Sequence, residues 1–133
     1  MGFHRYFSQI NEDFQAFPVF PENNSDGSHR IEGIGDSFVP EILSLEELGA
    51  MMRISDSDAI AVARLINKSG LSVGISSGAN LLAATKKAFE LKNGAIVGTI
   101  LCDDSKKYLS TDLCSESEEN ISYDFEVLDY KII

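Results

Sequence analysis

The strongest constraint on the fold is a helix-like segment near the middle of the chain, with short apolar runs on either side. The apolar residues of this segment recur at the spacing of one helix face: Ala59, Val62, Ala63 and Ile66. Ser55 stands in the N-cap position and Asp58 follows three residues later, as in a capping box. Gly70 is typical of a helix end. The pattern predicts a helix after Ser55, buried along one face.

Three apolar runs are predicted to be strands: Phe14 to Phe20, Leu71 to Ile75, and Ala95 to Cys102. A second helix is predicted from Gly78 to Leu91, between the last two runs. The run at Ala95 lacks polar alternation, so both faces of that strand are expected to be covered. Strands separated by helices favour an α/β fold with a parallel sheet and right-handed crossovers.

Composition restricts the class of protein. The 133 residues suffice for one modest domain, and 44% are hydrophobic, as in a globular chain. The formal net charge of −10 argues against nucleic acid as a partner. No apolar stretch is long enough to span a membrane, and the first residues lack a secretory signal pattern. With only Cys102 and Cys114, a disulfide framework is excluded and a reduced, cytoplasmic setting is expected.

The sequence Ser76-Ser77-Gly78 lies where a predicted strand meets a predicted helix. Sites in parallel sheets gather beyond the carboxyl ends of the strands, and free N–H groups point outward at helix N-termini. One interpretation is structural, with Ser77 as the N-cap, Ser76 as a turn residue and Gly78 allowing a tight turn. The other is a ligand-binding turn. The few histidines and cysteines stand at unrelated spacings, so no metal site is expected.

Three stretches resemble one family of pyridoxal-phosphate enzymes, the cysteine synthases and cystathionine β-synthases. They are His29 to Leu43, similar to the family's substrate-side loop; Gly74 to Asn80, similar to its cofactor-ring motif; and Asp103 to Thr111, similar to its terminal motif. The resemblance covers residues 1–111. It implies that this segment is a truncated three-layer α/β/α domain, the C-terminal portion of the fold-type II large domain, with a short, mostly parallel sheet.

The resemblance also implies roles for individual residues. Ser76 would hydrogen-bond the pyridine nitrogen of pyridoxal phosphate, with Ser77 capping the helix. Gly33, Ile34 and Gly35 would lie beside the substrate, in a loop whose glycines allow close approach and hinge motion. The alternative for these three residues is an ordinary loop before Pro40. No catalytic residue is assigned.

The sequence departs from the family pattern at several points. Cys102 stands where proline is usual, and is most simply a small buried residue, while Ser105 replaces the usual glycine. The family's phosphate cradle, its closing domain and its cofactor lysine have no match. None of the lysines has the expected context: Lys68, Lys86, Lys87, Lys92, Lys106, Lys107 and Lys131. We therefore expect no cofactor and no activity for the chain alone, and a missing N-terminal half, joined or separate, as its partner.

Alternatives remain open at this point. The parent enzyme is either a cysteine synthase or a cystathionine β-synthase acting on an amino-acid substrate, or the chain is a non-catalytic binding or regulatory module. Residues 112–133 match nothing in the family and hold seven acidic residues and one lysine. Within them, Ile121 to Ile133 alternates over its first positions and predicts an added strand, which could cover an edge or pair with a second copy.

Overall fold

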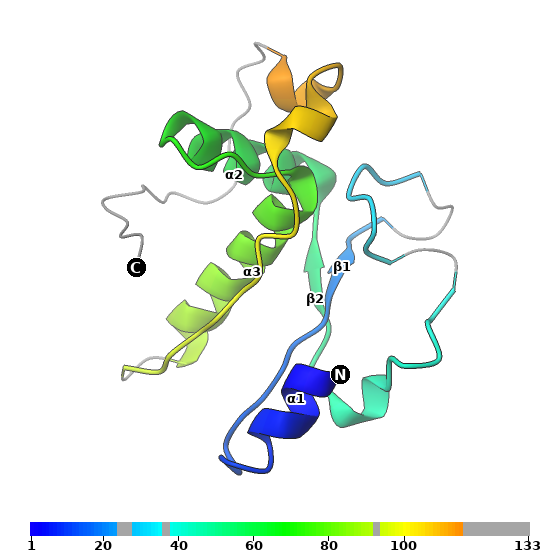
Figure 1. Ribbon diagram of the computed structural model, residues 1–133, viewed down its shortest axis with the longest axis vertical. Helices are drawn as coiled ribbons and strands as arrows, with labels where there is room; N and C mark the ends of the chain where they lie inside the picture. Colours follow the sequence, from blue (N-terminus) through cyan, green and yellow to red (C-terminus); the bar gives the residue numbers. More distant parts are fainter. Residues whose placement is uncertain (24–27, 36–37, 92–93, 116–133) are drawn as a thin grey trace.

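The computed structural model describes residues 1–23, 28–35, 38–91 and 94–115 (Figure 1). The helices and strands are α1 (Gly2–Phe7), β1 (Val19–Pro21), β2 (Met52–Ile54), α2 (Asp56–Lys68) and α3 (Ile75–Leu91). Short 3₁₀ helices cover Leu45–Glu47 (η1), Ser105–Tyr108 (η2) and Asp112–Cys114 (η3). No helix among the described residues is long and apolar enough to cross a membrane.

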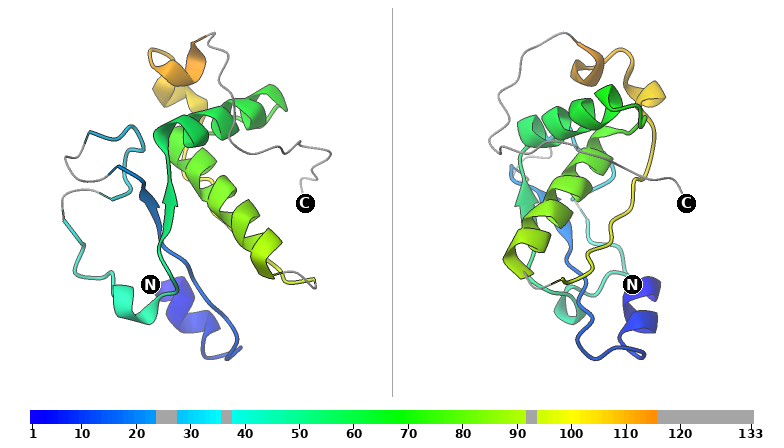
Figure 2. Two further views of the ribbon diagram at one scale, coloured as in Figure 1. Left: turned by 180° about the vertical axis from the view of Figure 1, so that it is seen from behind. Right: turned by 90° about the vertical axis from the view of Figure 1, so that its left-hand side faces the viewer.

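The sheet of the described chain consists of β1 and β2, which pair in parallel. Val19 lies opposite Met52, and Pro21 lies opposite Ile54. The helices α2 and α3 lie on one side of this pair, and α1 lies below the strands in the left-hand view of Figure 2. Parallel pairing confirms the α/β class predicted from the sequence. The strand β2 was missed, because its three residues hold no apolar run and a charged Arg53 stands at the centre.

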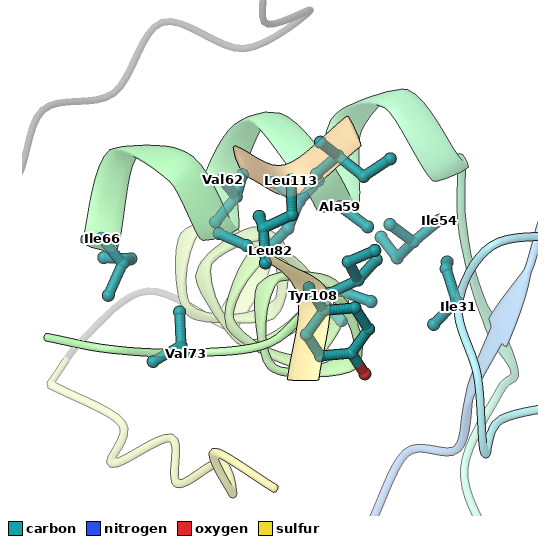
Figure 3. Packing of buried hydrophobic residues seen from close by; sticks show 14 residues of the cluster. Ile31, Ile54, Ala59, Val62, Ile66, Val73, Leu82, Tyr108 and Leu113 are labelled. Atoms are coloured by element: carbon teal, nitrogen blue, oxygen red, sulfur yellow. The ribbon is translucent and has the colours of Figure 1, made fainter. Parts of the chain in front are cut away.

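The first predicted helix is confirmed as α2. The Ser55 side chain accepts a hydrogen bond from the Asp58 backbone N–H, as a capping residue does. Gly70 adopts a positive φ of 98° just after the helix, a conformation that costs little without a Cβ. The four apolar positions of the predicted face are buried in the core (Figure 3).

The second helix begins at Ile75 rather than at Gly78, so the two serines lie inside its first turn. The sequence predicts a tight turn at Gly78, and this prediction is wrong. Gly78 lies instead where α3 crosses α2. A Cβ at this position would stand 2.1 Å from the Ala59 carbonyl oxygen and 2.9 Å from the Ala63 nitrogen. The glycine therefore lets the two helix backbones approach closely.

The three predicted strands are largely wrong in detail. Of the first run, Phe14 to Phe20, only Val19 and Phe20 belong to a strand, β1, and neither Leu71 to Ile75 nor Ala95 to Cys102 forms one. The run from Ala95 extends back beside α3 (Figures 1 and 2) with most of its side chains exposed, Cys102 included. A strand needs a ladder of hydrogen bonds to a neighbouring backbone. Within the described chain, the run from Leu71 to Ile75 has one backbone bond to a distant segment, from the Gly74 N–H to the Asp103 carbonyl, and residues 95–101 have none.

The two ends of the described chain are attached in different ways. Arg5 of α1 forms a two-point ion pair with Glu47 of η1. After η2, Leu113 of η3 packs into the core, and Arg64 of α2 donates to the carbonyls of Asp112 and Leu113. The predicted strand from Ile121 to Ile133 lies outside the described residues, and the domain boundary at residue 111 stays a prediction.

Candidate functional site

The site is built on the first turn of α3. Ser76 is 5% exposed and Ser77 is fully buried. The Ser77 hydroxyl accepts a hydrogen bond of 2.9 Å from the Cys102 backbone N–H. Since Ser77 lies within the helix, the predicted N-cap role is wrong. Its hydroxyl instead ties the helix to the segment that precedes the Asp103 motif.

The Ser76 hydroxyl is the candidate contact to the cofactor. Among the described residues this side chain makes no hydrogen bond. A hydroxyl is both donor and acceptor, so it suits a ring nitrogen in either protonation state. The structure thus leaves the predicted cofactor-binding residue chemically available, while its role stays a prediction.

The part-buried Asp103 and the buried Tyr108 form a pair against the turn that leads into α3. The Tyr108 hydroxyl donates a 2.7 Å hydrogen bond to Asp103 Oδ2, and the Gly74 N–H donates a 3.0 Å bond to the Asp103 carbonyl. A Cβ at Gly74 would meet Asp103 Oδ1 at 2.1 Å and the Tyr108 ring at 2.6 Å. Burial, followed by the Asp103 hydrogen bond, raises the pKa of Tyr108, so the phenol stays a donor.

The contact between Asp103 and Tyr108 was not predicted from the sequence. The motif that contains both residues was named, but neither residue was given a role. Their five-residue separation follows no helix or strand period, so only the 3₁₀ turn η2 reveals the contact. Ser105 stands where the family pattern has glycine, and its side chain contacts the neighbouring Ser72. Its N–H and hydroxyl both lie within hydrogen-bonding distance of the Ser72 hydroxyl, at 3.2 and 2.8 Å.

The predicted substrate loop packs against the same core as the α3 turn. Gly33 and Gly35 have positive φ values of 79° and 69°, which explains why both positions are glycine. Between them, Ile34 is half-buried against the cluster that contains Ile75 and Tyr108. Among the described residues no hydrogen bond joins this loop to Ser76, so its substrate role stays a prediction.

Other polar groups near the core bear on whether the part of the chain that the structure describes could hold a metal ion. Two buried side-chain atoms, His29 Nδ1 and Asp103 Oδ1, have no hydrogen-bond partner among the described residues. Within that part of the chain, no group of three or more His, Cys, Asp or Glu residues is placed to hold a metal ion.

Comparison with known proteins finds relatives that match this chain over part of their own length. No family model matches the chain. Cysteine synthase B of Campylobacter jejuni is 48% identical over 87 residues, which are 65% of this chain and 29% of that protein. A hydrogen sulfide-producing enzyme of Fusobacterium nucleatum superimposes with a TM-score of 0.82 at 37% identity, over 92% of this chain and 38% of that one.

A third relative is an O-acetylserine-dependent cystathionine β-synthase from Helicobacter pylori. It has a TM-score of 0.72 and 37% identity, over 84% of this chain and 39% of its own. The chain thus spans less than two-fifths of the length of these three relatives. The structural neighbours are fold-type II enzymes, which confirms the predicted fold class. The chain is similar to part of the cysteine synthases and related pyridoxal-phosphate enzymes, and matches them over a portion of their length.

Proposed function

We propose that the chain is the C-terminal part of a cysteine synthase-like enzyme, which makes cysteine from O-acetylserine and sulfide, and that it forms one wall of the active site. One observation carries the proposal: two of the family-like stretches meet at the start of α3. Cys102 donates to Ser77, and Gly74 donates to the Asp103 carbonyl, across more than twenty residues of sequence. The motifs therefore fold as one unit.

Within this wall, each residue has a defined task. Ser76 faces the pyridine nitrogen of pyridoxal phosphate, and its hydroxyl donates a hydrogen bond to that nitrogen or accepts one from it. Ser77 and Asp103 hold the turn that carries Ser76. The loop at Gly33 and Gly35 lies beside the amino-acid substrate. When bound, the cofactor supplies an electron sink for breaking and forming bonds at the substrate's β-carbon.

The chain alone is expected to hold no cofactor. The Ser76 hydroxyl offers one neutral hydrogen bond, with a net contribution of about 0.5–1.5 kcal/mol. Micromolar binding needs about 8 kcal/mol. The amine that must attack the cofactor aldehyde therefore comes from the lysine-bearing N-terminal part, on the same polypeptide or another.

The first test uses the isolated chain. It is mixed with pyridoxal phosphate, freed of excess, and examined for a stoichiometric absorption band of lysine-bound cofactor and for sulfide-dependent turnover of O-acetylserine. Neither signal is expected. If both appear, one of the lysines of this chain is the cofactor lysine and the one-wall proposal is wrong.

The second test restores the missing part. In a chimera, the chain replaces the matching portion of the Campylobacter jejuni cysteine synthase B. We expect cysteine formation, and a loss of about tenfold in kcat/KM for Ser76→Ala, since one lost hydrogen bond of about 1.4 kcal/mol corresponds to that factor. The control Ser76→Thr keeps the hydroxyl and should keep most of the activity. A folded chimera without turnover would contradict the proposal.

A cystathionine β-synthase is the second candidate, favoured by the likeness to the Helicobacter pylori enzyme. In that case homocysteine replaces sulfide as the nucleophile. Sequencing the coding region upstream of Met1 identifies any native lysine-bearing part. Turnover of the reconstituted protein with sulfide against homocysteine then separates the two candidates.

We also propose a cytoplasmic location. Cys102 and Cys114 are both free and exposed, which suits a reducing compartment. Fractionation of cells that express the tagged chain tests this proposal.

A further inference from the structure

The loop that contains Gly33 and Gly35 is anchored at its base to the first turn of α2. The Arg30 backbone N–H donates a 2.8 Å hydrogen bond to Asp56 Oδ2. The Arg30 guanidinium also approaches this carboxylate, with Nε 3.9 Å from the same oxygen. Asp56 is the first residue of α2, so the helix fixes its backbone. One carboxylate oxygen therefore contacts both the backbone and the side chain of the residue at the start of the loop.

The next residue fixes the base of the loop a second time. Ile31 is fully buried and packs in the core with Ile54 and Tyr108 (Figure 3). After Ile31, no backbone–backbone hydrogen bond joins residues 32–35 to the rest of the described chain. Arg30 and Ile31 therefore set the point from which the glycine segment of the loop extends.

The anchor on Asp56 lies close to the turn that carries Ser76. Asp56 stands three residues before Ala59, whose carbonyl oxygen would be 2.1 Å from a Cβ at Gly78. With a rise of about 1.5 Å per residue, these three residues span about 4.5 Å of α2. Ser76 precedes Gly78 by two residues on α3, a rise of about 3 Å. The base of the loop and Ser76 are thus both fixed within one helical turn of the α2–α3 crossing.

We propose that Asp56 is a positioning residue for the substrate. Through Arg30, it fixes the base of the predicted substrate loop relative to Ser76, so that the glycine segment meets an amino acid held at the cofactor. This inference rests on the proposed function and gives a task to a residue outside the three family-like stretches. In this assignment Asp56 itself touches neither the cofactor nor the substrate.

A second acidic residue contacts Arg30 but is placed to contribute less. Arg30 Nη1 forms an ion pair with Asp112 of η3. The Asp112 side chain is 55% exposed, against 25% for Asp56. Exposed ion pairs contribute little, because water screens them and both side chains lose freedom. Asp56 also holds the backbone N–H of Arg30, and is therefore expected to be the main anchor.

Hydrogen exchange tests the contact in the isolated chain without reference to activity. In Asp56→Ala, the Arg30 amide should exchange at least about tenfold faster than in the original chain. Asp56→Asn keeps an acceptor oxygen and should retain most of the protection. Arg30→Gln removes the guanidinium but keeps the N–H, so the amide of residue 30 should stay protected. If this amide exchanges at the rate of an unstructured peptide in the original chain, the proposal is overturned.

Kinetics of the Campylobacter jejuni chimera test the positioning role. For Asp56→Ala, we expect KM for O-acetylserine to rise about tenfold and kcat to fall by less than about twofold, because a displaced loop weakens binding of the substrate and of the transition state equally. Asp56→Asn should restore a KM within about threefold of the original. Ser55→Ala is the matched control, since it removes the cap of α2 and leaves the Arg30 contact in place. Its KM should not change. An equal rise of KM in Ser55→Ala would make the effect one of helix stability, and the proposal would be wrong.

Two further variants of the chimera separate the alternatives. Asp112→Asn should change KM by less than about twofold, because the pair that it breaks is exposed. An effect as large as that of Asp56→Ala would place the anchor on η3. Arg30→Gln should raise KM less than Asp56→Ala does. A larger rise would make Arg30 a direct contact to the substrate carboxylate. Either of these results would overturn the proposal.

The outcomes distinguish this inference from the proposed function. Turnover by the chimera with an unchanged KM in Asp56→Ala would overturn the positioning role and leave the proposed function standing. A folded chimera without turnover would contradict the proposed function and the positioning role together, whereas a protected Arg30 amide would still show the contact itself.

Discussion

The α2–α3 helix pair and the apolar strip, residues 95–101, differ in whether the described chain provides hydrogen-bond partners for their backbones. Both have sequence patterns that predict regular structure, yet only the helices form it. A helix closes its hydrogen bonds within one segment, whereas a strand needs a second backbone alongside. The pair therefore folds from local sequence and mutual packing. In the strip, the sequence pattern of a strand has no neighbouring strand, and its apolar side chains remain exposed.

The largest expected effect compares one buried and one exposed aliphatic residue. Leu82 of α3 is 1% exposed and packs in the core, so Leu82→Ala should lower the free energy of unfolding by about 3 kcal/mol. Ile96→Ala in the strip should change it by less than about 0.5 kcal/mol. Urea unfolding of the isolated chain measures both. Equal losses would show that the strip is packed in solution.

A somewhat smaller effect is expected at the helix crossing. Gly78→Ala would place a methyl group against the Ala59 carbonyl and push the helices apart. We expect a loss of about 2 kcal/mol, although alanine favours helix by about 1 kcal/mol over glycine. The control Gly98→Ala, whose Cβ meets nothing within 4 Å, should be nearly neutral. A stabilised Gly78→Ala variant would contradict the close crossing. Thermal and urea unfolding provide the readout.

The cap of α2 tests the local part of the comparison. Ser55→Ala removes the acceptor of the Asp58 N–H and should cost about 1 kcal/mol in unfolding free energy. Ser55→Asn offers another capping oxygen and should recover most of that loss. If the alanine variant is as stable as the original, α2 is held by its packing against α3 and not by its cap.

The smallest expected effect concerns the attachment of α1. The Arg5 hydrogen bond lowers the pKa of Glu47 to about 2. Because this carboxyl binds its proton less readily in the folded state, its contribution is fully present above its ordinary pKa near 4.5 and is lost as pH falls toward 2. A carboxyl NMR titration of Glu47 should show the low midpoint, and Arg5→Gln should return it toward 4.5. An unshifted midpoint would show that the Arg5–Glu47 ion pair does not form in solution.

The sequence anticipated the helical half of this fold better than the sheet. Ser55, the apolar face of α2 and Gly70 carry their information within a few residues, and each was confirmed. The start of α3 was placed three residues late, because the apolar run before Gly78 resembled a strand. Strand β2 escaped notice, since three residues with a central arginine show no period.

The candidate site divides in the same way. The motifs containing Ser76 and Gly33 to Gly35 could be named from the sequence, and the positive φ values explain two of those glycines. The Asp103–Tyr108 contact and the Cys102-to-Ser77 bond could not, because both depend on how η2 and the strip return to α3.

By itself, the sequence determined the likeness to cysteine synthases, the two main helices and the identity of the motif residues. Local spacing, capping chemistry and glycine conformations suffice for these, since each acts over a few residues. Only the tertiary structure decided that Gly78 serves the α2–α3 crossing, that Ser77 anchors Cys102, and that the run from Ala95 is exposed. Those outcomes depend on which backbones come together, and a strand's partner is a property of the whole assembly rather than of its own residues.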